Sequence, residues 1–217
     1  MPVTGVQTCA LPIWRFRGVP TSFICDAMDG RGSLDWRIKP VAGGGFAGVA
    51  LTCHCGPSDI LALQVAVARS QPGDVLVAAS DQFAGSAVVG DLLLGIAKNR
   101  GVVGFVTDGL VRDRADLQTL GMPVFAMGVC PNSPYKGGPG SVGLPVICGG
   151  RSIASGDIIV GDTDGVVTIP QGQIGEVLAN LDRVRAAEAE ALAKVKGGQS
   201  QVAAADELLK GPHVRWV

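Results

Sequence analysis

The sequence predicts an α/β protein built as one three-layer domain. Helix-like and strand-like segments alternate between residues 21 and 130, and short strands separated by glycine and aspartate turns follow between residues 144 and 170. Such alternation is typical of a sheet covered by helices, and we expect the later strands to extend the same domain. The 217 residues suit one domain, and 47% of them are hydrophobic, so a large core can form.

The composition narrows the possible classes of protein. Net charge is −1 and only 17% of residues are charged, which does not indicate a nucleic-acid binder. No apolar run reaches the ~18 residues of a membrane span, and a surface poor in charge favours an oligomer. The cysteines lie mostly in apolar runs, so we expect reduced core thiols in a cytoplasmic protein. They are Cys9, Cys25, Cys53, Cys55, Cys130 and Cys148.

Helices and strands alternate in the first part of the chain. A short helix is expected after Thr21 or Ser22, either of which can cap it, and before Gly30 and Gly32. The segments that follow are predicted from their apolar patterns and their glycine or proline boundaries. They are a strand within 43–55, a helix within 58–71, a buried strand at 74–79, a buried helix at 86–101, a strand at 102–109, a short helix at 115–121 and a strand at 123–129.

The helix within 58–71 has well-marked ends. Ser58 or Asp59 is the expected N-cap, and the Pro72–Gly73 pair ends the helix. Its expected buried residues are Ile60, Leu61, Leu63, Val65 and Val67.

The later part of the chain is rich in strands. A glycine-proline loop at 130–143 precedes three short strands within 144–150, 155–162 and 165–170. A long helix rich in alanine, glutamate and arginine is expected at 173–196, followed by a tail with a loosely attached helix.

The first residues differ from the rest. Residues 3–13 have no clear period and match the translation of a DNA segment that resembles a common sequencing adapter. A signal peptide would need a basic start and a longer apolar core. We therefore interpret residues 1–14 as an assembly artefact, residues 15–196 as one domain that includes the long helix, and residues 197–217 as a tail.

Charged residues gather in DGLVRD, where a buried strand ends. Loops after strands are a common place for chemistry in α/β proteins. Asp113 is a candidate ligand for Mg²⁺, which uses few carboxylates, and Arg112 is a candidate for paired contacts with a substrate carboxylate. The spacing alone favours the alternative, an ion pair of Asp108, Arg112 and Asp113 that braces the loop.

A second candidate is GDLLLGI at 90–96. Glycine before an apolar helix offers free N–H groups to an anion. Asp91 either orients a water or caps the helix, and the segment alone favours capping.

The segment TCHC at 52–55 is a third candidate. On a strand, Cys53 and Cys55 share a face and His54 points away from them. A zinc site needs four ligands, and the only other histidine is His213. A core strand is therefore the favoured interpretation, and His54 is a weak candidate for a general base.

In their order, these segments resemble the RraA-like family. The resemblance is carried by PGDVLV, GDLL, AKNRGVVGFVTDGLVRD, PVFAMG, PV-CGG and GD-I-GD-DGVV-IP, and it extends from about Thr21 to Lys194. The family includes 4-hydroxy-4-methyl-2-oxoglutarate and 4-carboxy-4-hydroxy-2-oxoadipate aldolases and regulators of ribonuclease E activity. The resemblance implies a swivelling β/β/α fold with a C-terminal helix, assembled as a homotrimer or hexamer with sites between subunits.

The resemblance also implies roles for single residues. Asp113 would hold Mg²⁺ or Mn²⁺, and Arg112 would contact a small 2-keto acid. Glu188 of a neighbouring subunit, or alternatively Glu190, would complete the site. Further substrate contacts would come from Gly90, Asp91, Leu92 and Leu93.

The implied reaction is a metal-dependent aldol cleavage. The metal would stabilise the enolate of a pyruvate-like product, and a base, such as a water oriented by Asp91, would take the proton of the C4 hydroxyl. Oxaloacetate decarboxylation needs the same enolate without that base, so we expect it as a side activity.

One departure and one alternative accompany this interpretation. The segment VLVAASDQFAGSAVVGDLL at 75–93 lacks the glycine-rich DGGG that many relatives have after the strand, which leaves the substrate open. The alternative function is a non-catalytic regulator of ribonuclease E that acts by protein–protein binding. Because that branch typically lacks an acid at this position, Asp113 favours an enzyme.

Overall fold

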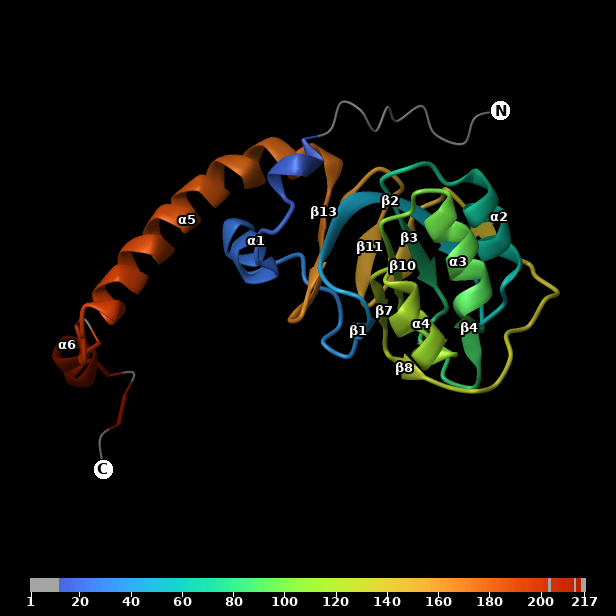
Figure 1. Cartoon of the computed structure of the whole chain (residues 1–217). Helices are drawn as coiled ribbons and strands as arrows, with labels where there is room; N and C mark the ends of the chain where they lie inside the picture. Colours follow the sequence, from blue (N-terminus) through green and yellow to red (C-terminus); the bar gives the residue numbers. More distant parts are fainter. Residues whose placement is uncertain (1–11, 203, 213, 216–217) are drawn as a thin grey trace.

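A mixed eight-stranded sheet forms the centre of the described structure, a computed structural model that covers residues 12–202, 204–212 and 214–215. The strands follow the order β1-β7-β5-β3-β2-β12-β13, and β9 also pairs with β2. The outer strands β1 and β13 contact each other, so the sheet curls into a half-barrel. The predicted α/β class and the C-terminal helix are confirmed (Figure 1).

The strands of the main sheet are β1 (Lys39–Ala42), β2 (Phe46–His54), β3 (Asp74–Ala79), β5 (Gly104–Thr107), β7 (Val124–Ala126), β9 (Ser141–Val142), β12 (Ile158–Asp162) and β13 (Gly165–Ile169). Strands β2, β3, β5 and β7 run parallel, and β1, β9 and β12 pair antiparallel with their neighbours in this group. The carboxyl ends of the four parallel strands therefore meet at one edge of the sheet.

Two small sheets accompany the main one. A hairpin of β10 (Val146–Cys148) and β11 (Arg151–Ile153) packs on β2 and β3. A parallel sheet is formed by β4 (Ala87–Val89), β6 (Leu110–Val111) and β8 (Gly128–Val129). Along the chain, β4, β6 and β8 come after β3, β5 and β7, so the small sheet lies beyond the carboxyl ends of these strands. This small sheet positions the candidate site.

Helices cover the main sheet in two groups (Figure 1). Helices α2 (Leu61–Arg69), α3 (Asp91–Asn99) and α4 (Arg114–Leu120) pack their buried side chains against one face of the sheet. Helix α1 (Thr21–Ala27) and the start of α5 (Ile174–Lys196) pack with β12 and β13 in a separate apolar cluster. A third cluster lies between the sheet and the β10–β11 hairpin. The remaining helical elements are η2 (Ile13–Arg15), η3 (Gln171–Gln173) and α6 (Ala205–Lys210).

The helix predicted at 86–101 begins later than expected. Residues 87–89 form strand β4, and α3 begins at Asp91. A short apolar run followed by glycine is compatible with strand or helix, and periodicity alone does not separate them. The prediction of a wholly buried helix was also wrong, because Leu92 and Ile96 are exposed.

Helix α2 is rotated relative to the prediction. Ala62, Leu63, Ala66 and Val67 are buried on the helix, whereas Leu61 and Val65 are exposed. Small alanines form much of the buried face, whereas the prediction placed only the larger apolar side chains on it. Asp59 accepts the N–H of Leu61 through Oδ1 at 2.8 Å, although Ile60 is the N-cap residue.

Helix α1 is capped from a distance. Its N-cap residue is Pro20, so the prediction of Thr21 or Ser22 as N-cap was wrong. The Thr21 N–H and hydroxyl both donate to the Asp162 carboxylate, at 2.7 and 2.8 Å. At the other end, Gly30 has φ +74° and its N–H donates to Cys25, so the predicted glycine stop is confirmed.

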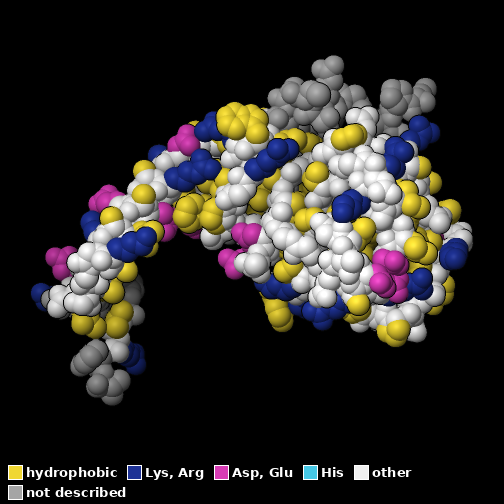
Figure 2. All heavy atoms as spheres, in the orientation of Figure 1, with side chains coloured by type: hydrophobic (Ala, Val, Ile, Leu, Met, Phe, Trp, Pro, Cys, Tyr) yellow, Lys and Arg dark blue, Asp and Glu magenta, His cyan; other side chains and the backbone are white. Residues whose placement is uncertain are grey.

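The long helix α5 confirms the prediction for 173–196. Its first half is anchored by Ile174, Val177, Leu178 and Leu181, and its second half projects from the domain with basic and acidic side chains along it (Figures 1 and 2). In the tail, α6 follows.

Several earlier predictions concern the chain ends and the cysteines. Cys9, His213 and residues 1–11 of the adapter-like stretch lie outside the described residues. Ile13 packs against the cluster that contains α1 and α5. The five described cysteines are free thiols, and Cys53, Cys55 and Cys148 are buried. None of the described helices has the length and apolar character needed to cross a membrane.

Candidate functional site

One small cavity brings together six of the residues predicted to form a site. It has a volume of about 280 Å³. One wall is the start of α3, and the opposite walls are the end of β6 and the loop at 133–136. The predicted residues that line it are Gly90, Asp91, Leu92, Leu93, Arg112 and Asp113.

Pairing of β4 with β6 brings these segments together. The two strands run parallel, and Val89 lies opposite Val111. The Arg112 N–H donates to the carbonyl of Val89 at 3.0 Å, which extends the pairing by one residue. Gly90 and the Arg112–Asp113 pair, 22 residues apart in sequence, therefore leave their strands side by side.

Asp113 occupies a special backbone position. Its φ is +59° and ψ is 42°, in the left-handed region, and it is the N-cap residue of α4. Aspartate tolerates this conformation better than most residues. The turn aims the carboxylate at Gly90 instead of along the helix.

Gly90 is the residue that gives this carboxylate room. A Cβ at position 90 would lie 2.1 Å from Asp113 Oδ2 and 3.0 Å from Arg112 Cγ and Nε. No side chain fits there without displacing both groups. The absence of a side chain at Gly90 is thus part of the site.

The Arg112 guanidinium is held on two sides. Its Nε donates to Asp113 Oδ2 at 3.1 Å, and its Nη1 donates to Ser133 Oγ at 2.7 Å. Among the described residues, Nη2 has no protein acceptor. The side chains of Arg112 and Asp113 are each about one-third exposed. A small anionic molecule in the cavity can therefore reach both side chains.

Asp108 is not part of this ion pair, which corrects the bracing alternative. Its side chain is 2% exposed, and Oδ1 accepts the N–H of Ser80 at 2.7 Å. Burial raises the pKa of the Asp108 carboxyl, and the N–H groups of Ser80 and Gly149 offset part of that rise. Asp108 therefore joins β3 to β5 from inside the core.

Asp91 does not cap α3 with its side chain. Gly90 is the N-cap residue, with extended backbone, and no side chain makes a capping hydrogen bond there. Within the part of the chain that the structure describes, the first N–H groups of α3 therefore have no side-chain acceptor, and they lie at the positive end of the helix dipole. This end of α3 is suited to an anion, with Asp91 beside it.

Glu188 and Glu190 do not line this cavity in the same chain. Both are exposed on α5, and Glu190 pairs with Lys194 one turn later. Their expected role concerns a neighbouring subunit, so it stays a prediction.

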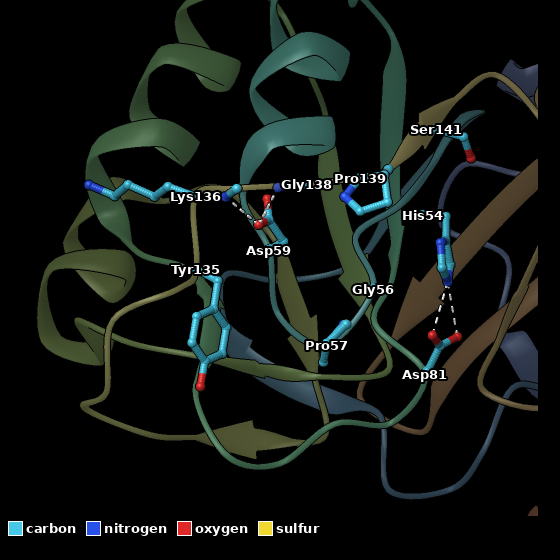
Figure 3. A pocket seen from close by; sticks show the side chains of 12 residues that line it. His54, Gly56, Pro57, Asp59, Asp81, Tyr135, Lys136, Gly138, Pro139 and Ser141 are labelled. Atoms are coloured by element: carbon cyan, nitrogen blue, oxygen red, sulfur yellow. Dashed lines mark hydrogen bonds and ion pairs between the residues drawn. The ribbon is translucent and has the colours of Figure 1, made fainter.

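His54 lies at a second, larger cavity. This cavity has a volume of about 760 Å³ and a wall formed by the loop at 135–141 (Figure 3). His54 Nε2 lies 3.0 Å from Asp81 Oδ2, and Asp81 has a left-handed φ of +55°. Asp81 follows β3 in the stretch that lacks the glycine-rich DGGG, and sequence reasoning missed its contact with His54.

A zinc centre at TCHC finds no support in the described residues. Cys53 and Cys55 are buried together with sulfur atoms 3.8 Å apart, and His54 points to the other cavity. No described cluster of three or more His, Cys, Asp or Glu side chains is arranged to hold a metal. The favoured interpretation as a core strand fits this arrangement.

Sequence reasoning also missed the wall of the site formed by the 130–143 loop. Ser133 and Lys136 line the cavity together with Ile60 and Gln64. The sequence predicts only a glycine-proline loop at 130–143, and nothing in its pattern indicates which helix it faces.

Comparisons with known proteins identify the family to which this chain belongs. The profile of the RraA-like family, described as Aldolase/RraA, matches residues 21–168. The chain belongs to the RraA-like family. A Halalkalibacterium halodurans protein provisionally named 4-hydroxy-4-methyl-2-oxoglutarate aldolase is 39% identical over 175 residues, which cover 80% of this chain and 83% of the relative.

Solved structures share the fold of this chain. The RNA-processing inhibitor RraA from Thermus thermophilis aligns with a TM-score of 0.65 and 25% identity, over 70% of this chain and 93% of that one. An uncharacterized protein from Pseudomonas syringae pv. tomato aligns with a TM-score of 0.76 and 24% identity, over 87% of this chain and 93% of that one. Proteins similar to this chain are thus described as an RNA-processing inhibitor in one case and provisionally as an aldolase in another.

Proposed function

We propose that the protein is a divalent-metal-dependent aldolase. Its substrate would be 4-hydroxy-4-methyl-2-oxoglutarate or a related 4-hydroxy-2-keto acid, cleaved to pyruvate and a second keto acid, with oxaloacetate decarboxylation as a side activity. The observation that carries the proposal is the Asp113 carboxylate, which faces Gly90 beside Arg112 and the free end of α3. The name of the H. halodurans relative supports the same reaction class.

The residues present fit a magnesium or manganese ion. The carboxylate of Asp113 would hold the ion, and Asp91 lines the same cavity beside it. Mg²⁺ is commonly bound through one or two carboxylates and keeps several waters, so it needs no cluster of three protein ligands. Asp113 Oδ2 occupies the space that a Cβ of residue 90 would fill, so the carboxylate reaches the cavity wall formed by the start of α3. An ion bound here would supply a Lewis acid that stabilises the enolate formed in the reaction.

The chain's own groups would bind and orient the substrate. The N–H groups of Gly90–Leu93 and the Nη2 of Arg112 are free to donate to the carboxylate and keto oxygens of the pyruvate half. Because Asp113 and Ser133 already fix the guanidinium, little motion is lost when substrate binds. The pyruvate half is thereby held with C3 in one orientation.

Cleavage then needs one proton transfer at each end of the broken bond. The C4 hydroxyl loses its proton, C4 becomes the keto carbon of the second product, and the electron pair of the C3–C4 bond passes to C3. Asp91 lies where it can orient the group that accepts the hydroxyl proton. Protonation of C3 completes pyruvate.

The proposal is tested by pyruvate release from the purified protein. We expect release from 4-hydroxy-4-methyl-2-oxoglutarate and from oxaloacetate with Mg²⁺ or Mn²⁺, and loss of both reactions with EDTA. Restoring the metal should restore the rate. Folded protein that releases no pyruvate from either substrate would contradict the proposal and favour the non-catalytic regulator that acts by protein–protein binding.

A further inference from the structure

A third cavity lies at the edge of the main sheet opposite to the candidate site. Its volume is about 880 Å³, which is in the range of small-molecule sites. It is lined by Phe46 and Ala47 at the start of β2, by residues 102–103 before β5 and by residues 122–123 before β7. Because β2, β5 and β7 run parallel, these residues mark the amino edge of the sheet. The proposed aldol chemistry, at the carboxyl edge, does not use this cavity.

The floor of the third cavity is apolar and firmly packed. Phe46, Val102 and Met122 are all nearly buried. The Phe46 ring lies against two strands at glycines, since a Cβ would lie 2.4 Å from the ring at Gly161 and 2.9 Å from it at Gly104. Apart from three charged side chains, every described residue of the lining is apolar or glycine. The floor therefore suits an aliphatic group that needs no hydrogen bonds.

The one acid in this lining is Asp162, and donors of the chain already satisfy it. Oδ2 accepts the Thr21 N–H at 2.7 Å. Oδ1 accepts the Thr21 hydroxyl at 2.8 Å and the Asp164 N–H at 2.9 Å. The carboxylate thus holds the start of α1 and the turn after β12, and it has no need of either cation of the cavity.

The two cations in the lining are Arg17 and Lys98. Arg17 follows η2, and Lys98 lies in the last turn of α3, so the charges come from different elements. Both side chains are exposed, and neither forms an ion pair with a described carboxylate. Lys98 Nζ donates to the carbonyl of Leu120 at 2.5 Å, which leaves two of its hydrogens for another acceptor. The open side of the cavity is therefore suited to an anion.

We propose that this cavity binds an amphiphilic carboxylate, a molecule with one anionic head and an unbranched aliphatic tail, such as a medium-chain fatty acid. Arg17 and Lys98 bind the head, and the tail covers the apolar floor beside Phe46. Charge complementarity favours this occupant, because the lining has two cations and one acid that is already hydrogen-bonded. A small polar anion would leave the floor in contact with water, and a neutral lipid would leave the cations without a partner. The inference goes beyond the proposed function and does not depend on it.

Binding of octanoate tests the inference directly. Two comparison compounds isolate its parts, because 1-octanol has the same tail without the charge and acetate has the head without the tail. By isothermal titration calorimetry, we expect octanoate to bind roughly tenfold or more tightly than 1-octanol, as a charge-assisted hydrogen bond allows. Acetate should bind at least about 100-fold more weakly than octanoate, because burial of the tail is lost.

Removal of the two charges tests the head of the ligand. The double variant Arg17→Met, Lys98→Met keeps side chains of similar length, and it should lose the preference for octanoate while 1-octanol binding changes less than about twofold. The matched control is Lys196→Met, Lys210→Met, which removes two exposed charges from α5 and α6. This control should retain the preference.

Filling the cavity tests the place of the tail. Gly44 lines the cavity, its φ is not positive, and no heavy atom lies within 4 Å of the position of an added Cβ. Gly44→Leu should therefore fold and weaken both octanoate and 1-octanol by at least about fivefold, because the leucine occupies space that the tail needs. Gly172 has equally open surroundings and lies outside the cavity, so Gly172→Leu should bind both compounds as the natural protein does.

Three results would overturn the inference. The first is an absence of octanoate binding, or octanoate and 1-octanol binding with equal affinity. The second is a preference for octanoate that survives Arg17→Met, Lys98→Met. The third is unchanged binding in folded Gly44→Leu, which would place the tail elsewhere.

Discussion

At the residue scale, an absent side chain shapes the candidate site. Gly90 leaves space that Asp113 Oδ2 and the Arg112 side chain occupy. The parallel pairing of β4 with β6 brings these residues into this close approach. The sequence alone did not reveal the approach, because the spacing of GDLL and VRD says nothing about strand pairing. The family resemblance predicted that the two segments share a site, and the structure brings them together in one cavity.

Gly90→Ala tests this geometry against a matched change in the same helix. The methyl group would meet Asp113 Oδ2, so we expect kcat/KM for pyruvate release to fall at least about 100-fold, as for a misplaced catalytic group. In Gly95→Ala, the added Cβ meets only Leu120 at 3.9 Å. That variant should keep its activity and gain roughly 0.5–1 kcal/mol of stability, because alanine is the better helix former. Full activity in Gly90→Ala would show that the close approach is unimportant.

At the scale of elements, the loop at 130–143 depends on one buried carboxylate. Burial alone would raise the pKa of Asp59, but the N–H groups of Leu61, Gly138 and Gly137 together outweigh it and hold the pKa below its ordinary value of 3.8. A carboxyl with a lowered pKa in the folded state stabilises the protein above the unfolded-state pKa. This stabilisation is lost as the pH falls through the lowered value.

The pH dependence of unfolding checks this sign. The difference in Tm between the natural protein and Asp59→Asn should be constant from pH 7 to about pH 5 and shrink below about pH 4. Asp74→Asn is the control of opposite sign, because burial raises the pKa of Asp74 and its protonation favours folding. The Tm of the natural protein, relative to that of Asp74→Asn, should rise as the pH falls. An Asp59→Asn difference that stays constant down to pH 2 would contradict the role of Asp59.

The elements also show where the sequence pattern was insufficient. Residues 74–79 and 173–196 were predicted well, since each has a single clear pattern and clear ends. Residues 86–90 were assigned to a helix because an apolar run before glycine has no distinctive period. The loop at 130–143, which carries Ser133 and Lys136, has no periodic pattern, and its position depends on contacts with Asp59 that are distant in sequence.

At the scale of the whole molecule, the fold class was predicted from helix–strand alternation, and the swivelling β/β/α fold was implied by family resemblance. Neither the small sheet β4-β6-β8 nor the curl of the main sheet follows from local pattern, because both depend on pairing between distant strands. The homotrimer or hexamer, and the role of Glu188 from a neighbouring subunit, stay predictions. The projecting half of α5 bears that residue outward from the domain (Figure 1).

The most direct test of the account is the metal dependence of pyruvate release in Asp113→Ala. Asp116→Ala, an exposed position on α4, is the matched control for loss of one carboxylate near the site. We expect Asp116→Ala to release pyruvate from 4-hydroxy-4-methyl-2-oxoglutarate at the natural rate with Mg²⁺. Asp113→Ala should lose at least about 100-fold in kcat/KM and should no longer respond to added metal or to EDTA. A folded Asp113→Ala protein with natural, metal-dependent activity would contradict the assignment of this cavity as the active site.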